Sequence, residues 1–338
     1  MNKCLKIGII GAGRIGKLHA SNLARRISKA KPVALSDINK KEAQKLARLL
    51  DIPAVYDDYK EILADPAIEA VFICSSTDTH SEISMEAAKA GKHIFCEKPI
   101  DYDIHKIKSV LDIVKKKGVK YQVGFNQRFD PDYCRIKKAV SSGELGQLRI
   151  IKITSRDPAP PPIEYIKTSG GIYADMTIHD FDMMRYLCGS EITEVSAAGA
   201  CLVDPAIGKA GDADTCVVTL RFANGSLGII DNCRQSSYGY DQRIEVFGSK
   251  GQIIADNLKQ NNTVLYNGSG IRQEKLLHFF LERYRDSYIR EAEEFVDACL
   301  NNTDVFVGAY DGLQSVLVAL AAQKSHNMGG MPVKVGEQ

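Results

Sequence analysis

A lysine stands between a glutamate and a proline where the apolar run at residues 93–96 ends, in the sequence HIFCEKP. An amine after a buried strand is costly unless it is solvated or paired, so Lys98 is a candidate for chemistry. Pro99 restricts Lys98 to extended geometry and permits a cis peptide bond. Such an amine could stabilise an oxygen that gains negative charge during a reaction. The alternative is a solvated Glu97–Lys98 charge pair in an ordinary loop.

A second group of reactive residue types lies in the sequence DMTIHDFD, residues 175–182. If a helix begins near Asp175, then Asp175 and His179 share one face, and Asp182 follows three residues later. A histidine with an ordinary pKa of about 6.5 can remove a proton near neutrality, and a carboxylate can orient its ring. Helix capping or a buried core histidine is the alternative. No third ligand follows at a recognisable spacing, so we expect no metal.

The N-terminal sequence predicts a dinucleotide-binding turn. Gly11, Gly13 and Gly16 stand between an apolar run at residues 4–10 and a helical pattern at residues 17–30. In such a unit the first glycine makes a tight turn, the second lets the backbone approach a pyrophosphate, and the third allows close helix packing. The N-terminus of the helix also offers N–H groups to the phosphates.

The carboxylate that would complete this site is Asp37, which lies 21 residues after Gly16 at the end of the next strand-like run. A spacing of about 20 residues is typical of the carboxylate that binds the ribose hydroxyls of NAD. Asp37 could instead cap the helix near Lys40, and Lys40 and Lys41 keep NADP open as the cofactor. The strand end at residues 75–80 could line the nicotinamide side or simply cap a helix. We expect cofactor contacts from Gly11, Gly13, Arg14, Ile15, Gly16, Asp37, Ser75, Ser76, Thr77 and His80.

Two patterns of elements position these residues. Alternating strand-like and helical runs predict a Rossmann domain at residues 1–124, a doubly wound parallel sheet wrapped by helices. Strand-like runs joined by turns such as Asn224-Gly225 predict an α+β domain at residues 125–338 with a large, mostly antiparallel open sheet. We expect an α/β protein of two domains, whose open sheet is covered by helices at residues 288–300 and 312–326 and by a partner subunit in a dimer or tetramer.

The composition of the 338 residues excludes several classes of protein. The formal net charge is +2, which gives no field that would attract nucleic acid or an anionic membrane. No apolar run approaches the roughly 20 residues that span a bilayer. The nine cysteines are scattered without a C-x-x-C pair, which is typical of reduced thiols. We therefore expect a cytoplasmic protein that acts on a small molecule.

Over essentially the whole chain, the sequence resembles the glucose-fructose oxidoreductase, inositol dehydrogenase and rhizopine catabolism protein (Gfo/Idh/MocA) family of nicotinamide-dependent oxidoreductases. The shared motifs are the glycine turn, E-K-P, DMTIHDFD and YGYD at residues 238–241. The resemblance implies a catalytic Lys98 before a usually cis Pro99, with Glu97 beside the nicotinamide ribose. It implies that His179 is the general base and that Asp175 orients the substrate and Lys98. The implied substrate contacts are Lys98, Arg128, Asp157, Asp175, His179, Asp182 and Tyr240.

The DMTIHDFD motif is closest to the inositol dehydrogenase branch of the family. The resemblance therefore implies NAD-dependent oxidation of myo-inositol to 2-keto-myo-inositol. Two departures, Asp157 where this branch often has Asn and Gln127 where Arg is common, leave the preferred polyol open. The alternatives are a scyllo-inositol or pyranose sugar dehydrogenase, an NAD-dependent glycosidase, and a nucleotide-sensing regulator of the same fold. A sensor needs no acid–base set, so Lys98, Asp175 and His179 together argue against it.

Overall fold

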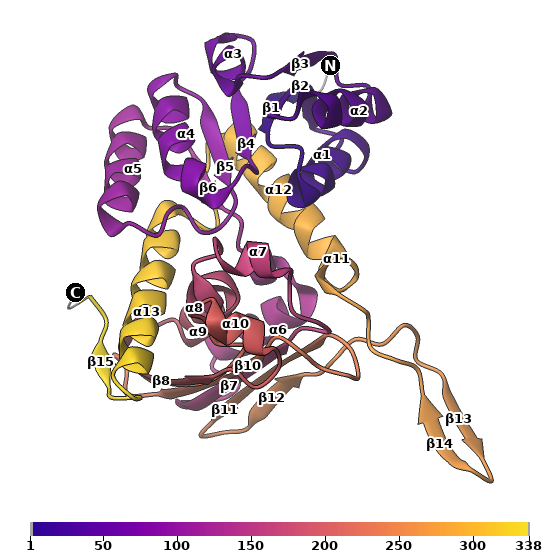
Figure 1. The fold of residues 1–338 in the computed structure, drawn as a ribbon, viewed down its shortest axis with the longest axis vertical. Coiled ribbons are helices and arrows are strands. Elements are labelled where there is room, and N and C mark those ends of the chain that lie inside the picture. The colour runs from indigo at the N-terminus through magenta and orange to yellow at the C-terminus, as the bar shows by residue number, and fades with distance from the viewer. Residues whose placement is uncertain (1–2, 337–338) are drawn as a thin grey trace. The chain divides into compact units, whose positions relative to one another are not determined.

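The computed structural model of the protein describes residues 3–336 (Figure 1). The chain divides into two compact units. The first unit contains the chain up to Phe129 together with Asp286–Val316, and the second contains Asp130–Arg285 and the chain from Leu317 onward. The predicted α/β fold class is confirmed, and the domain boundary at residues 124 and 125 stays a prediction. The sequence did not indicate that the chain returns to the first unit after residue 285.

A six-stranded parallel sheet forms the centre of the first unit, in the order β3-β2-β1-β4-β5-β6. Because the order reverses between β1 and β4, this is where a parallel sheet binds its ligand, outside the carboxyl ends of the strands. The strands are β1 (Leu5–Ile10), β2 (Ala30–Ser36), β3 (Ala54–Tyr56), β4 (Ala70–Ile73), β5 (His93–Cys96) and β6 (Tyr121–Val123).

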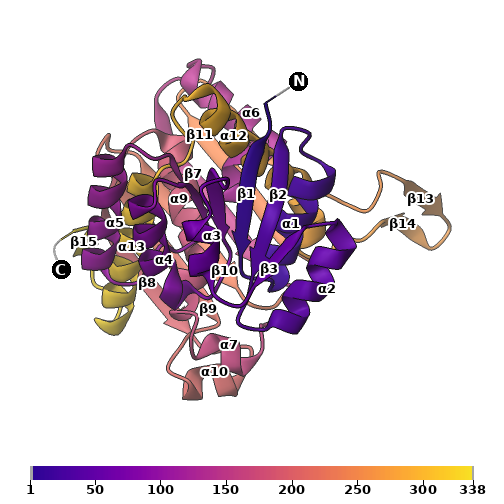
Figure 2. The same cartoon turned by 90° about the horizontal axis from the view of Figure 1, so that it is seen from above.

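Helices surround this sheet, with α4 and α5 packed against each other (Figure 2). Several of the helices around the sheet begin or end at residues with ordinary capping geometry. The side chain of Asn39 accepts a hydrogen bond from the Glu42 N–H at the start of α2, and Gly118 ends α5 with a φ of 66°. The helices are α1 (Arg14–Arg25), α2 (Lys40–Leu50), α3 (Tyr59–Ala64), α4 (Thr77–Lys89), α5 (Ile104–Lys117), the 3-10 helix η1 (Asn126–Phe129) and α12 (Arg285–Asn301).

Helix α12 contributes to the core of the first unit. Its residue Phe295 contacts Phe72 and Phe95 edge-on, with ring centroids 5.4 and 5.9 Å apart. Ala292 and Val296 belong to the same buried cluster. The expectation that residues 288–300 cover the C-terminal sheet is wrong, because the aromatic side chains of β4 and β5 match the apolar face of α12.

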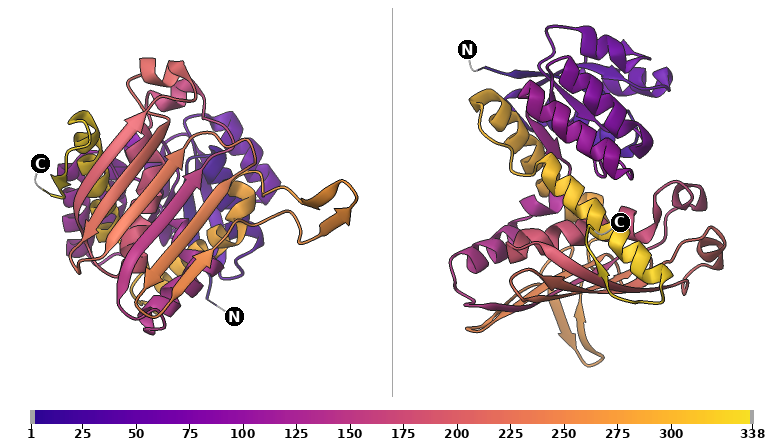
Figure 3. Two further views of the ribbon diagram at one scale, coloured as in Figure 1. Left: turned by 90° about the horizontal axis from the view of Figure 1, so that it is seen from below. Right: turned by 90° about the vertical axis from the view of Figure 1, so that its left-hand side faces the viewer.

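A seven-stranded sheet forms the base of the second unit, in the order β12-β11-β7-β10-β9-β8-β15 (Figure 3). All neighbours are antiparallel except β7 and β10, which are parallel, so the mostly antiparallel sheet is confirmed. Strands β13 and β14 form a separate hairpin. The strands are β7 (Leu148–Arg156), β8 (Ile192–Ala200), β9 (Thr215–Phe222), β10 (Leu227–Cys233), β11 (Asp241–Gly248), β12 (Gln252–Ala255), β13 (Val264–Asn267), β14 (Gly270–Gln273) and β15 (Val333–Lys334).

Helices pack on one face of this sheet. Near the end of α13, Ser325 Oγ accepts a hydrogen bond from the Ala197 N–H, and His326 Nδ1 accepts one from Gly199, which fixes that end to β8. The predicted cover from residues 312–326 is therefore present in part, since α13 contains the boundary between the units. The helices are α6 (Pro131–Ser141), α7 (Ile163–Ile166), α8 (Gly171–Asp175), α9 (Thr177–Cys188), α10 (Pro205–Lys209), α11 (Phe280–Arg283) and α13 (Ala309–Asn327). Among residues 3–336, none of the helices combines the length and the apolar character needed to cross a bilayer.

Candidate active site

The glycine turn joins β1 to α1 and leaves open space at one glycine only. Gly11 has a φ of +103°, and a Cβ there would lie 2.5 Å from the Cys74 carbonyl oxygen. A Cβ on Gly16 would lie 2.0 Å from the Gly11 carbonyl oxygen, whereas a Cβ on Gly13 would meet no atom within 4 Å. Gly11 and Gly16 are therefore required by the fold. Gly13, together with the exposed Arg14 and half-buried Ile15, leaves the room that a bound pyrophosphate needs.

Asp37 lies beside this turn. Its Oδ2 accepts a hydrogen bond of 2.6 Å from the backbone N–H of Ala12, and its Oδ1 accepts one of 2.7 Å from Asn39. The N-cap of α2 is Asn39, so the alternative that Asp37 caps that helix is wrong. A half-buried carboxylate beside the glycine turn fits the ribose hydroxyls of a dinucleotide.

The end of β4 carries Ser75, Ser76 and Thr77, and α4 begins at Thr77. Ser76 is the N-cap, but its side chain makes no capping hydrogen bond, while the Ser75 and Thr79 hydroxyls are 2.7 Å apart. The alternative that this strand end simply caps a helix needs Thr77, Asp78 or Thr79 at the N-cap position, which Ser76 occupies instead. Ser75, Ser76 and Thr77 therefore stand at the carboxyl end of the strand next to β1, and their contacts with the cofactor stay a prediction.

His80 is buried and bonds to backbone at both ring nitrogens. Nδ1 lies 2.8 Å from the Pro99 carbonyl oxygen and Nε2 lies 3.1 Å from that of Ser75. Burial lowers the pKa of His80, but Cys96 and the two carbonyl groups outweigh this and raise the pKa to about 9. The protonated ring therefore connects the end of β4 to the E-K-P segment. His80 therefore has a structural role, and its contact with the cofactor stays a prediction.

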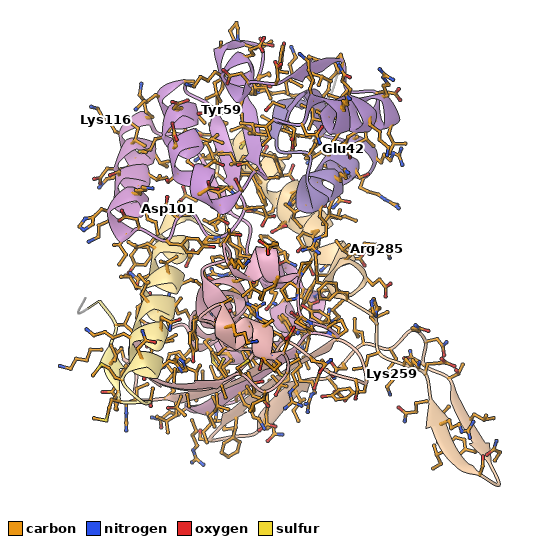
Figure 4. The ribbon with its side chains drawn as sticks, in the orientation of Figure 1. Glu42, Tyr59, Asp101, Lys116, Lys259 and Arg285 are labelled. Atoms are coloured by element: carbon orange, nitrogen blue, oxygen red, sulfur yellow. The ribbon has the colours of Figure 1, made fainter. Side chains whose placement is uncertain are left out.

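The E-K-P segment follows β5, and the peptide bond between Lys98 and Pro99 is cis. The Glu97 N–H donates to the Ile73 carbonyl oxygen at 3.0 Å, which keeps the segment aligned with β4. Asp101, labelled in Figure 4, lies just after the segment. It is buried, and its Oδ2 accepts a hydrogen bond of 2.5 Å from the Ser81 hydroxyl of α4. Lys98 is half-buried while Glu97 and Pro99 are buried, so the lysine is the accessible member of the motif.

Glu97 contacts a histidine that sequence reasoning did not select. Its Oε1 lies 2.8 Å from Nε2 of His19, which comes from the second turn of α1. The carboxylate also fills the space beside Gly124, where a Cβ would lie 3.0 Å from Oε2. The Glu97 carboxylate is thus directed toward the interior of the first unit, and its contact with the nicotinamide ribose stays a prediction.

In the second unit, Asp175 and His179 lie on two consecutive short helices. Asp175 ends α8, and the helix expected to begin near Asp175 is α9, which begins at Thr177 and contains His179 in its first turn. The intervening Met176 keeps right-handed helical torsions, with φ −92° and ψ −60°, so the helical course of the chain continues across the junction. Both side chains are half-buried.

Two residues that the sequence analysis missed hold Asp175. The Tyr165 hydroxyl donates to Asp175 Oδ1 at 2.8 Å, and Nη1 of the buried Arg234 lies 3.3 Å from Oδ2. Arg234 also lies 3.7 Å from Asp212. Charge-assisted contacts of this kind orient a carboxylate. Arg234 directly follows β10, just as Glu97 of the E-K-P segment directly follows β5, and that position was a signal available in the sequence.

The buried Asp180 anchors the turn of α9 that carries His179. Its oxygens accept hydrogen bonds from the Ser155 hydroxyl at 2.8 Å and from Asn232 Nδ2 at 2.7 Å. Burial raises the pKa of Asp180 to about 7 against the opposing effect of these hydrogen bonds. Asp182, predicted to contact substrate, is also buried, with 1 % of its surface exposed. Its contact with substrate stays a prediction.

The second sheet brings further predicted residues to one edge. Cys233, the last residue of β10, pairs with Arg156 of β7, which in turn pairs with Asp241 of β11. Asp157 follows β7, and its N–H donates to the Cys233 carbonyl oxygen at 2.9 Å. Tyr240 precedes β11 and packs on Phe279 and Tyr284. The sheet topology therefore brings Asp157, Tyr240 and the Arg234–Asp175 pair to the same end of these neighbouring strands, which we call the sheet edge.

Arg128 belongs to the first unit, in the 3-10 helix η1. It is buried, and its Nη2 lies 2.9 Å from Oδ1 of Asp311. The ion pair joins η1 to the start of α13, so Arg128 has a structural partner within its own unit. Its contact with substrate stays a prediction.

Comparisons with known proteins extend these observations. The family model described as an oxidoreductase family with an NAD-binding Rossmann fold matches residues 5–125, and the GFO/IDH/MocA C-terminal domain matches residues 133–254. The chain therefore belongs to the Gfo/Idh/MocA oxidoreductase family, and its first unit is an NAD-binding domain.

Three relatives illustrate the similarity. The chain is 49% identical to a myo-inositol 2-dehydrogenase of Thermotoga maritima over 95% of this chain and 96% of that protein. It is 43% identical to an inositol 2-dehydrogenase of Rhizobium meliloti, again over 95% and 96%. The crystal structure of a Lactobacillus casei scyllo-inositol dehydrogenase with bound NAD(H) and scyllo-inositol is 34% identical, covers 99% of this chain and 100% of that one, and has a TM-score of 0.93.

Proposed function

We propose that this protein oxidises one hydroxyl of a cyclic polyol to a ketone with NAD, and that its substrate is myo-inositol, giving 2-keto-myo-inositol. The observation that carries the proposal is the similarity to inositol 2-dehydrogenases of 43% and 49% identity along nearly the whole chain. Fold alone would not support a substrate, since one fold serves many reactions. The residues available for acid–base chemistry supply the second support.

The residues of the first unit fit NAD. The backbone around Gly13 and the N-terminus of α1 would hold the pyrophosphate, and Asp37 would accept hydrogen bonds from ribose hydroxyls. Asn39 follows Asp37 and caps α2, so the space after the carboxylate carries no arginine that would favour a 2′-phosphate. When bound, NAD supplies the hydride acceptor for the reaction.

The proton and the developing charge would be handled by His179 and Lys98. His179 is half-buried on a helix anchored by Asp180, and it would remove the hydroxyl proton as general base. The Lys98 amine would stabilise negative charge on the same oxygen. Asp175, oriented by Tyr165 and Arg234, would direct the substrate hydroxyl toward this pair. The reaction needs no metal in this scheme.

The remaining contacts would select the polyol. A ring with a hydroxyl on every carbon offers many donors and acceptors, which polar residues at the sheet edge can match. Asp157 and Tyr240 stand at that edge of the second sheet. Arg128 and Asp182 are the other residues proposed to contact the ring.

scyllo-Inositol is the second candidate substrate. A Bacillus subtilis scyllo-inositol 2-dehydrogenase is 36% identical over 99% of this chain, and the Lactobacillus casei structure is a scyllo-inositol enzyme. The two inositols differ only in the configuration at one carbon, so the same acid–base residues serve either. The side chains at the sheet edge would decide between them.

The proposed assembly is a homo-oligomer in the cytoplasm, formed through the open face of the second sheet. Side chains on that face alternate with buried ones along β9 and β10, and they include the exposed Val217, Leu227, Ile150 and Ile254. Figure 3 shows this face in its left panel. Exposed apolar side chains on an open sheet face are normally covered. A second copy of the chain can cover them by pairing the same face of both copies.

A substrate panel tests the proposal. The formation of reduced nicotinamide would be followed with NAD or NADP against myo-inositol, scyllo-inositol and D-glucose, with NMR identification of the product. We expect turnover with NAD and myo-inositol and a ketone product, lost in Lys98→Ala while NAD still binds. Turnover with glucose alone, or NAD binding without turnover of any polyol, would contradict it.

A further inference from the structure

Three polar side chains from distant parts of the sequence meet in the interior of the first unit. His19 comes from α1, Glu97 follows β5 and Glu291 comes from α12. His19 Nε2 lies 2.8 Å from Glu97 Oε1 and 3.9 Å from Glu291 Oε1. We call His19, Glu97 and Glu291 the buried triad, because all three are buried. Buried polar groups persist where they are paired, so this arrangement calls for a role.

Aromatic side chains fix the imidazole ring of the triad. The ring centroid of His19 lies 4.9 Å from Phe95, 5.5 Å from Phe72 and 5.8 Å from Tyr288. The contacts with Phe95 and Tyr288 are edge-on. Because three rings restrict its rotation, His19 presents Nε2 to the carboxyl groups in one orientation.

The two carboxyl groups of the triad differ in their surroundings. Glu291 is 0 % exposed, and neither of its oxygens has a hydrogen-bond partner among the described residues. Burial and the neighbouring Glu97 raise the pKa of Glu291 well above its ordinary range. Glu97 is the hydrogen-bonded partner of His19, because its Oε1 lies 2.8 Å from Nε2, whereas the nearest Glu291 oxygen lies 3.9 Å away.

The triad is directly connected to the segment that carries Lys98. Glu97 is the residue immediately before Lys98, and His19 is on the helix that begins at the glycine turn. The hydrogen bond of 2.8 Å connects the cofactor-binding helix to the E-K-P segment from inside. Gly124 completes the site, because a Cβ there would lie 3.0 Å from Glu97 Oε2.

We propose that His19, set between Glu97 and Glu291, is a positioning residue that fixes the segment carrying Lys98 for polyol oxidation. The inference rests on the proposed function, in which the Lys98 amine stabilises the oxygen being oxidised. Without the His19 N–H group, the Glu97 carboxylate loses its interior partner and turns, and the adjacent Lys98 shifts with it. An error of about 1 Å in the position of a catalytic group can lower a rate by roughly 100-fold.

The test compares His19→Leu with His19→Gln, because the Gln amide can supply an N–H group near the position of Nε2. His93→Leu is the matched control, since it makes the same change at the opposite end of β5, where the His93 ring accepts a hydrogen bond from the Lys120 N–H. The measurements are kcat with myo-inositol, the NAD dissociation constant, the melting temperature, and the ¹³C NMR signal of Lys98 after reductive methylation. The NMR signal reports on Lys98 without any substrate.

We expect His19→Leu to lower kcat by about tenfold or more and to shift the Lys98 signal, with the NAD dissociation constant changed by less than about threefold. His19→Gln should restore most of kcat, and His93→Leu should leave it near that of the wild type. Equal losses in His19→Leu and His19→Gln, or an unshifted Lys98 signal in His19→Leu, would overturn the proposal. A stoichiometric metal ion in the purified protein that is lost in His19→Leu would also overturn it, because the triad would then be a metal site. If the wild type oxidises no polyol, the proposed function fails, and the NMR comparison still decides the positioning role.

Discussion

At the scale of single residues, the orientation of Asp175 depends on two partners, Tyr165 and the more distant Arg234. Arg234 is buried and contacts both Asp175 and Asp212, while Tyr165 donates to the other oxygen of Asp175. A carboxylate held by a cation and a hydroxyl has one preferred orientation. The orientation of Asp175 is thus set before substrate arrives.

Arg234→Met should therefore impair catalysis through Asp175. We expect kcat/KM for myo-inositol to fall by about tenfold or more, since a misoriented carboxylate no longer directs the hydroxyl. Tyr165→Phe removes one hydrogen bond and should cost less. The measurement is steady-state kinetics at saturating NAD, with NAD affinity as the control. A normal kcat/KM in a folded Arg234→Met protein would refute this role of Arg234.

The raised pKa of Glu291 predicts how the stability of the folded protein depends on pH. Because its folded-state pKa is raised, the folded protein holds a proton that the unfolded chain releases above the ordinary pKa near 4.5. The associated cost to stability is absent below that pH and grows as pH rises toward the folded-state pKa, by up to about 1.4 kcal/mol per pH unit. Glu291→Gln has no such titration.

The melting temperature of Glu291→Gln relative to wild type should accordingly increase from about pH 5 to about pH 8. Glu293→Gln on the same helix is the control, because Glu293 is exposed. A difference that stays constant across this range would mean that Glu291 does not hold a proton in the folded protein.

At the scale of elements, Gly13 and Gly16 of the β1–α1 turn have different roles. Gly16 supports helix packing, because a Cβ there would lie 2.0 Å from a backbone oxygen, whereas Gly13 faces open space. Gly16→Ala should lower the melting temperature. Gly13→Ala should fold normally but bind NAD about tenfold or more weakly, because the added methyl group occupies the space for the pyrophosphate. Thermal unfolding and NAD titration of both variants check this, and normal NAD affinity in Gly13→Ala would contradict it.

Many of the helices and strands, and the domains they form, could be predicted from the sequence. The strand–glycine–helix order and Asp37 predicted the cofactor domain, and strand-like runs joined by turns predicted the second sheet. The course of α12 could not be predicted, because its apolar face fits either a sheet or a Rossmann core, and only the Phe72–Phe95 pair decides. His19, Glu291 and Arg234 were missed for a related physical reason. Their partners come from residues that are close in space and distant in sequence.

At the scale of the whole molecule, the outer face of the second sheet is the proposed interface between copies. Val217 is 50 % exposed there, opposite Asp231 of β10. Val217→Lys places a charge beside Asp231, which a single copy tolerates but a buried interface does not. We expect light scattering to show a dimer or tetramer for wild type and a smaller species for Val217→Lys. Leu49→Lys, on the exposed side of α2, should not change the assembly, and a monomeric wild type would contradict the interface.

The proposed reaction moves a hydride from the carbon of a ring hydroxyl to NAD. Its most direct test uses myo-inositol deuterated at the oxidised carbon, with mass spectrometry of the reduced nicotinamide and the ketone. We expect one deuterium in the reduced nicotinamide, none in the ketone at that carbon, and loss of both products in Lys98→Ala. Reduced nicotinamide without deuterium, or unchanged inositol beside a protein that binds NAD, would contradict it.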